Sequence, residues 1–321
     1  MSNYFPKVSV MIITYNQEHL IGETIDSVIS QNYQNLEVVV ADDASTDGTQ
    51  AVIKAYQEKY PELVKPVLNP VNLGITGNSN AAFFACTGDL VAVLGGDDLF
   101  LPGKIASQVK QFEDPEVVLS YHPVEVFFHQ TGEVLFTSNT TEKERINDVY
   151  DIIGKGGIAG ASSVMVRRSA CPEHGFDPSF PVVSDWIFYI EVAMKGKVKE
   201  LSGIYGRYRK HGLGASERTF ELLDESLRTL DVIRAHYPND RKLEVACQRG
   251  GYRYVLGEVY RQVIKRNPEK IKELRPYLLS YCSGFKRQLT KVALAVLSNP
   301  LFMGLMVGPL QRLRTTLKRS V

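Results

Sequence analysis

Features that would indicate a sulfur-bound metal or a disulfide-rich fold are scarce in this chain. Its 321 residues include four cysteines, which lie far apart and form no CxxC pair and no cluster with histidine. We expect buried free thiols in a reducing compartment, with a disulfide framework or a zinc site as alternatives. No GxGxxG follows the first predicted strand, which excludes a dinucleotide-dependent dehydrogenase.

The N-terminus lacks the cleavage site and long apolar segment of a signal peptide. Its apolar residues 8–13 form a short, almost continuous run. Such a run is typical of a strand that is covered on both faces. We therefore expect a strand here and a protein that stays in the cytoplasm.

Acidic residues are absent from the last part of the chain. Residues 274–321 contain eight Lys or Arg and no Asp or Glu, so residues 1–273 hold the other 29 basic and all 36 acidic residues. The overall net charge of +1 therefore hides an acidic body and a basic tail. This asymmetry suggests that the tail, residues 286–321, meets an anionic membrane surface.

Residues 292–310 are uncharged and just long enough to consider a membrane span. However, Ser298-Asn299-Pro300 interrupts the segment, and two further glycines and a proline weaken helix continuity. We predict peripheral or re-entrant attachment at the cytoplasmic face of the membrane. A true span and a soluble core or oligomer helix are the alternatives.

The pattern before residue 110 alternates short apolar runs with helical periodicity. Runs at 8–13, 36–41 and 90–94 and a strand near 64–68 predict a mostly parallel, doubly wound α/β sheet flanked by helices. Ligands of such sheets bind at the carboxyl ends of the strands. We expect a catalytic domain over 1–216, a helical extension over 217–285 and the basic tail over 286–321.

Three polar clusters follow directly on predicted strands: Thr14–Asn16, Asp42-Asp43 and Asp97-Asp98. Adjacent carboxylates on a strand-end turn suit Mg²⁺ or Mn²⁺. A lone Asp-Asp pair is weak, because such pairs also cap helices and form turns. The joint arrangement of the clusters, rather than either pair, indicates a site.

The chain resembles a known family over two blocks. Residues 7–49, KVSVMIITYNQEHLIGETIDSVISQNYQNLEVVVADDASTDGT, closely resemble the start of the family 2 glycosyltransferases, which have the GT-A fold. Residues 72–105, NLGITGNSNAAFFACTGDLVAVLGGDDLFLPGKI, match its second block, which ends in the family's DxD-type element. The resemblance covers residues 7–110 well and extends more thinly to 216.

The resemblance implies roles for individual residues. Asp98 matches the metal ligand, although Gly95 stands where many relatives carry a further acid. Tyr15 and Asp43 match residues that hold the nucleotide base, and Asp97 matches a position near the ribose. The full set expected to bind the donor is Thr14, Tyr15, Asn16, Asp43, Asn72, Asn78, Asp97, Arg209 and His211.

Inverting transfer also needs a base that takes the proton from the acceptor hydroxyl. Val183-Ser184-Asp185 resembles the family's base segment, with Ser184 in place of the first acid, which leaves Asp185 as the base. The alternative makes Ser184 or Asp185 a helix N-cap. Trp186 is either core or a stacking platform for an acceptor sugar.

The resemblance thus implies an inverting, metal-dependent hexosyltransferase of cell-surface polysaccharide or lipopolysaccharide biosynthesis. A UDP-, GDP- or dTDP-sugar would be the donor and a glycan or polyprenyl-linked sugar the acceptor, and we expect no nucleic-acid partner. A nucleotidyltransferase and a non-catalytic membrane-associated relative are the alternatives. The first would favour a Gly-rich basic loop after the first strand, where this chain has Thr14-Tyr15-Asn16.

Overall fold

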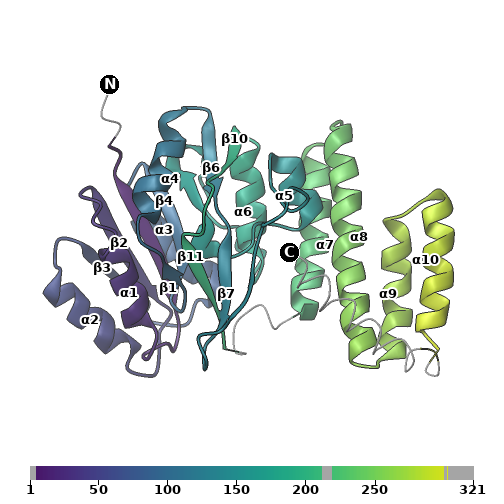
Figure 1. Cartoon of the computed structure of the whole chain (residues 1–321), viewed down its shortest axis with the longest axis horizontal. Helices are drawn as coiled ribbons and strands as arrows, with labels where there is room; N and C mark the ends of the chain where they lie inside the picture. The colour runs from purple at the N-terminus through teal and green to yellow at the C-terminus, as the bar shows by residue number, and fades with distance from the viewer. Residues whose placement is uncertain (1–4, 212–218, 300–301, 303–321) are drawn as a thin grey trace. The chain divides into compact units, whose positions relative to one another are not determined.

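The chain divides into two compact units (Figure 1). A computed structural model describes residues 5–211, 219–299 and 302. The first unit comprises residues 1–149 and 158–214, and the second comprises 150–157 and 215–321. The expected boundary at 216 lies outside the described residues.

The first unit is built on a seven-stranded sheet in the order β10-β6-β9-β4-β1-β2-β3. The pairs β1–β2, β1–β4, β2–β3 and β6–β10 are parallel, whereas β9 runs antiparallel to β4 and β6. The sheet is therefore mostly parallel, as expected. Its strands are β1 (Val8–Thr14), β2 (Leu36–Asp42), β3 (Val64–Leu68), β4 (Leu90–Gly95), β6 (Val117–Tyr121), β9 (Met165–Arg167) and β10 (Lys197–Glu200).

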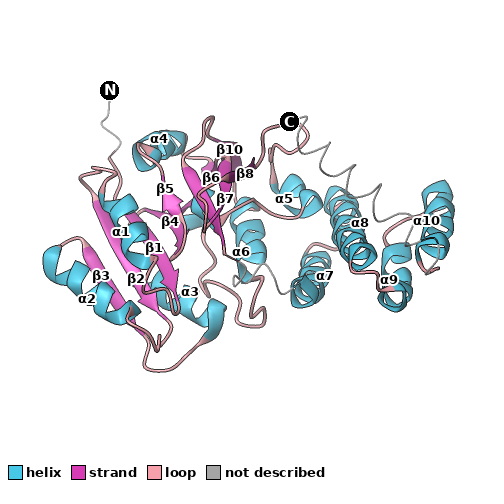
Figure 2. Ribbon diagram, turned by 60° about the horizontal axis from the view of Figure 1, so that its bottom comes forward, coloured by secondary structure: helices cyan, strands magenta, loops and turns pink. Residues whose placement is uncertain are grey.

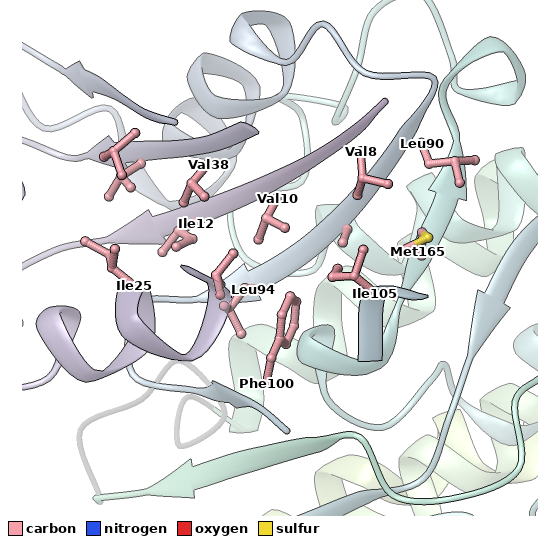
Figure 3. Close-up of a cluster of buried hydrophobic side chains, with 14 of the residues drawn as sticks. Val8, Val10, Ile12, Ile25, Val38, Leu90, Leu94, Phe100, Ile105 and Met165 are labelled. Carbon is pink, nitrogen blue, oxygen red and sulfur yellow. The ribbon is translucent and has the colours of Figure 1, made fainter. Parts of the chain in front are cut away.

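Helices cover both faces of this sheet, which Figure 2 shows as a layer of strands between helices. One face packs against α1 (Ile21–Ile29), α2 (Thr49–Lys59) and α4 (Lys104–Val109), and the other contacts α3 (Gly74–Ala85) and α6 (Ser184–Ala193). Burial on both faces explains the nearly continuous apolar runs of the central strands. Figure 3 shows the first of these cores, in which Val10, Ile12 and Leu94 lie beside Ile25 and Phe100.

A second, four-stranded sheet has the order β5-β11-β7-β8. Its strand β5 (Leu99–Phe100) follows directly on the Asp97-Asp98 pair and pairs antiparallel with β11 (Gly206–Lys210). The β5–β11 pairing therefore brings the basic-aromatic element, Tyr205-Gly-Arg-Tyr-Arg-Lys-His211, next to the acidic pair. The other strands are β7 (Val124–Phe128) and β8 (Val134–Thr137).

The second unit is helical. It contains α7 (Thr219–His236), α8 (Arg241–Ile264), α9 (Pro268–Ser280) and α10 (Gly284–Leu297), together with most of α5 (Val149–Lys155). Asp240 caps α8 by accepting a hydrogen bond from the amide of Leu243, and its other carboxylate oxygen accepts one from the hydroxyl of Tyr150 on α5. A segment from within the expected catalytic domain thus belongs to the helical unit.

Three expectations about the organisation of the chain can be compared with the structure. All four cysteines are buried and free, as expected, and their reducing compartment stays a prediction. Leu294 of α10 shares a core with Val255 and Leu278, so α10 packs within the helical unit, and the tail boundary expected at residue 286 stays a prediction. No helix among the described residues is long and apolar enough to cross a membrane. Most of the segment 292–310 lies outside these residues.

Candidate active site at the carboxyl edge of the sheet

The polar clusters predicted from the sequence meet at one edge of the sheet. Thr14 at the end of β1 is paired with Asp42 at the end of β2, and Ile13 is paired with Gly95 at the end of β4. The amide of Asp43 donates to the carbonyl of Thr14 at 3.0 Å. The parallel register therefore confirms that the three clusters converge.

Two glycines shape the turn before the acidic pair. A Cβ on Gly96 would lie 2.7 Å from the Cβ of Thr14, which leaves no room for a side chain there. A Cβ on Gly95 would lie 2.9 Å from Oδ1 of Asp97. A side chain at position 95 would therefore require the Asp97 carboxylate to move.

Asp98 is buried, with 2% of its surface exposed. Its Oδ1 accepts a hydrogen bond from the backbone amide of Arg209 at 2.9 Å, and its own carbonyl accepts one from the Thr24 hydroxyl at 2.9 Å. Burial, and then the neighbouring Asp97 charge, raise the pKa of Asp98 well above its usual value. A nearby cation would favour the ionised form of this carboxyl group.

Asp97 is the more accessible acid of the pair, with 19% of its side chain exposed. Its Oδ2 lies 2.8 Å from Nε2 of His211, and its carbonyl accepts a hydrogen bond from Nε of Arg209 at 2.6 Å. Arg209 and His211 therefore contact the acidic pair, whereas the resemblance implied that they contact the donor diphosphate. Of the two acids, Asp97 is better exposed to an incoming ligand, whereas the sequence favoured Asp98 as the metal ligand.

Arg209 is held inside the protein rather than presented to solvent. It is 6% exposed, lies 4.8 Å from the ring of Phe127 and donates to Glu23 of α1 at 2.6 Å. A guanidinium with these partners positions the acidic pair and contributes positive charge nearby. Its direct contact with a donor phosphate stays a prediction, as does that of His211.

The acidic pair fits a divalent cation that arrives with a diphosphate. Carboxylate oxygens are the ligands that Mg²⁺ and Mn²⁺ prefer. Across residues 5–211, 219–299 and 302, no group of three or more His, Cys, Asp or Glu side chains could hold a metal ion. Mg²⁺ is commonly held by one or two carboxylates and completed by substrate phosphates. Two carboxylates therefore suffice only if the substrate supplies further ligands.

Asp43 has a clear structural task. It is 4% exposed, and its two carboxylate oxygens accept hydrogen bonds from the amides of Leu73 at 2.7 Å and Gly74 at 3.0 Å. These amides belong to the start of α3, where an anionic acceptor is favourable. The Asn72 side chain donates to the Asp43 carbonyl at 3.1 Å. The binding of a nucleotide base by Asp43 stays a prediction.

Asn78 is also a structural residue in this arrangement. It is 3% exposed and donates to the carbonyls of Thr14 and Ala41, while its own oxygen accepts from Asn69. It ties the ends of β1 and β2 to α3. The contact of Asn78 with a donor stays a prediction.

Tyr15 and Asn16 lie in the turn after β1. Tyr15 is 47% exposed, so its ring is available to a ligand. Asn16 has a φ of 52° in the left-handed region, which asparagine tolerates better than most residues. Its amide donates to the Ser45 hydroxyl at 2.8 Å, and its side-chain oxygen accepts from the amide of Thr46. These contacts join the first and second polar clusters.

Asp185 lies exposed in the first turn of α6. The N-cap residue of α6 is Val183, which makes no side-chain capping hydrogen bond, so neither Ser184 nor Asp185 is the N-cap residue. Ser184 is 2% exposed and accepts a hydrogen bond from the hydroxyl of Thr76 in α3 at 2.8 Å. This contact fixes the start of α6 to the first turn of α3.

Trp186 is 3% exposed. A ring with so little accessible surface cannot stack openly on an acceptor sugar, and the structure supports the core alternative.

Sequence reasoning overlooked Gln17 and Glu23, which accept hydrogen bonds from Thr14 and Arg209. It gave no role to Asp42, which is fully buried and has an oxygen, Oδ1, without a hydrogen-bond partner. Only the position of Asp42 at a strand end pointed to it.

Residues 9–174 match the model of glycosyl transferase family 2. An uncharacterized glycosyltransferase of Nostoc is 31% identical over 73% of this chain and 75% of its own. An uncharacterized protein of Mycobacterium tuberculosis is 30% identical over 64% of this chain, and the matched region spans 60% of that relative.

A relative with a specific name is the Escherichia coli UDP-Glc:alpha-D-GlcNAc-diphosphoundecaprenol beta-1,3-glucosyltransferase WfaP. It is 29% identical over 72% of this chain and 88% of its own. Two solved structures share the fold, which confirms the expected GT-A architecture. The first is Pyrobaculum calidifontis mannosyltransferase PcManGT in complex with GDP-Man and Mn²⁺, which is 18% identical with a TM-score of 0.62 and covers 95% of this chain and 88% of its own. The second is Staphylococcus aureus TarS 1-349 in complex with UDP, which is 17% identical with a TM-score of 0.63 and covers 95% of this chain and 91% of its own.

Proposed function

This chain belongs to glycosyl transferase family 2, and on that premise we propose that it transfers a sugar from a nucleotide-diphosphate donor, with inversion, to a glycan or lipid-linked acceptor of cell-surface polysaccharide. The observation that carries this proposal is the convergence of Thr14, Asp42 and the Asp97-Asp98 turn at one sheet edge. Ligands of open α/β sheets bind at such an edge.

The donor would bind where the acidic pair and the Tyr15 turn meet. A divalent cation bound there would stabilise the negative charge that develops on the leaving diphosphate. Asp97 and Asp98 would hold that cation, His211 and Arg209 would orient Asp97, and the exposed Tyr15 ring would contact the base. WfaP, whose name specifies a UDP-glucose donor and a diphosphoundecaprenol-linked acceptor, supports these substrate classes.

Asp185 would act as the general base. It is an exposed carboxylate at the start of α6, and the Thr76–Ser184 hydrogen bond holds this helix start against α3. Within the same sequence stretch, Ser184 and Trp186 are buried and unable to accept a proton from an acceptor hydroxyl. Asp185 would take that proton as the hydroxyl attacks the anomeric carbon.

Peripheral attachment at the cytoplasmic face of a membrane is part of the proposal. The described helix α10 exposes Phe285, Leu289 and Val292 to 78%, 56% and 65%, and Lys286 and Arg287 are exposed beside them. An exposed apolar stripe with basic neighbours suits the surface of an anionic bilayer. A lipid-linked acceptor would be reached at that surface.

The proposal is tested by measuring sugar transfer and hydrolysis from a panel of UDP-, GDP- and dTDP-sugars. Asp185→Asn should lower turnover by about a hundredfold or more and leave donor binding near normal, because the base acts only on the acceptor. Glu173→Gln, which alters an exposed acid elsewhere in the first unit, is the matched control and should keep wild-type turnover. Equal turnover of Asp185→Asn and wild type would reject Asp185 as the base.

The products formed also distinguish the two alternative functions, a nucleotidyltransferase and a non-catalytic relative. A nucleotidyltransferase would consume a nucleoside triphosphate and release pyrophosphate rather than a nucleoside diphosphate. A non-catalytic relative would bind nucleotide without turnover of any sugar in the panel.

A further inference from the structure

The helical unit contains a groove that the proposed transfer chemistry does not use. It has a volume of about 600 Å³ and is lined by side chains of α7, α8 and α9. Volumes of this size are typical of small-molecule sites. All residues that line it belong to the second unit, and none of them belongs to the carboxyl edge of the sheet.

Each helix contributes one face to the groove. Asp224, Arg228 and Asp231 follow one another at helical spacing on α7, and Glu244 and Gln248 are four residues apart on α8. Residues with this spacing lie on the same side of a helix. The groove is thus the meeting of three polar helix faces above the apolar core of the unit.

The third face presents two tyrosines, Tyr277 on α9 and Tyr281 just after it. Tyr277 is 56% exposed, so its ring is open to a ligand. The ring of Tyr281 packs against Gly251 of α8. A Cβ at position 251 would collide with this ring, so only glycine leaves space for it. The guanidinium carbon of Arg234 lies 5.5 Å from the centre of the same ring.

Arg234 forms ion pairs with two acids of the groove. Nε of Arg234 lies 2.9 Å from Glu244 and its NH1 lies 3.4 Å from Asp231. The lining as a whole has three carboxylates and two guanidinium groups. A phosphate or nucleotide would need an excess of positive charge, which this lining does not offer. An apolar ligand would need more than the single aliphatic side chain, Leu227, among these polar groups.

A neutral ligand rich in hydroxyl groups matches this surface. Carboxylates accept hydrogen bonds, guanidinium and amide groups donate them, and the Gln248 side chain does both. The exposed tyrosine ring adds an apolar face with a polar edge. We propose that this groove binds a neutral oligosaccharide segment of the acceptor glycan. The identification of that glycan as the acceptor rests on the proposed glycosyltransferase function.

The test is saturation-transfer NMR on the full chain with short neutral oligosaccharides of glucose, galactose, mannose and N-acetylglucosamine. At least one should bind, and a saturating concentration of UDP or GDP should not displace it. Tyr277→Ala should weaken that binding about tenfold, through loss of the ring contact. Tyr277→Phe should retain most of it. Tyr237→Ala removes a 37%-exposed tyrosine that does not line the groove, and it should bind like wild type.

Two outcomes would overturn the inference: no oligosaccharide of the panel binds, or binding is equal in wild type and Tyr277→Ala. Both leave the proposed function intact if sugar transfer from a nucleotide donor persists. Conversely, a chain that binds oligosaccharide in this groove but transfers no sugar would retain the groove as a glycan site and reject the proposed function.

Discussion

Two buried carboxylates at opposite ends of the same sheet differ sharply in their surroundings. Glu37 near the start of β2 is 1% exposed, and Asp98 after β4 is 2% exposed. Burial alone would raise the pKa of Glu37, but Lys65 at 2.6 Å, Lys7 at 2.8 Å, Ser9 and Thr87 lower it well below its usual range. At Asp98, burial and Asp97 raise the pKa instead.

The difference separates Glu37, a carboxylate that stabilises the fold, from Asp98, a carboxylate that does not. Glu37 accepts hydrogen bonds from Ser9 on β1, from the amide of Thr87 and from Lys65 on β3, so it joins the amino-terminal ends of neighbouring strands. Asp98 has a second carboxylate as its neighbour, and no lysine among the residues that the structure describes lies within ion-pair distance of it. Perturbed acids of the second kind are common at functional sites.

The largest expected contrast between the two is in activity. Asp97→Ala and Asp98→Ala should each lower sugar transfer by about a hundredfold or more, because each removes a proposed ligand for the cation that would stabilise the leaving diphosphate. Glu37→Gln should keep wild-type turnover at a temperature at which the variant is folded. Initial rates with the best donor of the panel measure this. A comparable loss of turnover in Glu37→Gln would contradict the assignment of activity to the carboxyl end of the sheet and of stability to the amino end.

Stability should show the reverse order. Glu37→Gln should lower the free energy of unfolding by roughly 2 kcal/mol, because charge-assisted hydrogen bonds to Lys65 and Lys7 are lost. Asp98→Asn should cost less than about 0.5 kcal/mol without metal, since the amide keeps an acceptor for the Arg209 amide and removes a buried charge. Urea denaturation of both variants in a chelating buffer measures the difference. Equal losses would refute the contrast.

A smaller effect is expected in the pH dependence of stability. The pKa of Glu37 is lower in the folded than in the unfolded protein, so its contribution is complete above the unfolded value of about 4.3 and is lost as the pH falls through the folded value. Between about pH 5 and pH 2, the stability of the wild type should therefore approach that of Glu37→Gln. Parallel curves over this range would argue against the lowered pKa.

Much of the first unit follows from local sequence. The apolar runs 8–13, 36–41 and 90–94 became β1, β2 and β4, and the polar residues after them meet at one edge. Parallel strands place their carboxyl ends together, so the location of the site needs only the order of strands and turns. The resemblance to family 2 supplied the matching of Asp97-Asp98 and the basic-aromatic element.

The remaining features depend on contacts between distant residues. The amide that binds Asp98 comes from Arg209 on β11, and the lysines around Glu37 come from Lys7 and β3. No local pattern distinguishes Asp43, which caps α3, from an acid that holds a base. The burial of Trp186 likewise follows from tertiary packing. These partners determine which polar residues are accessible, and sequence spacing does not contain them.

The most direct measurement is calorimetric titration of the full chain with UDP, GDP and dTDP, with and without Mn²⁺. At least one nucleotide should bind, more tightly with Mn²⁺, and Asp98→Ala should abolish the metal dependence while Glu37→Gln retains it. Absence of binding by every nucleotide under every condition would contradict the assignment of the carboxyl edge as a nucleotide-sugar site.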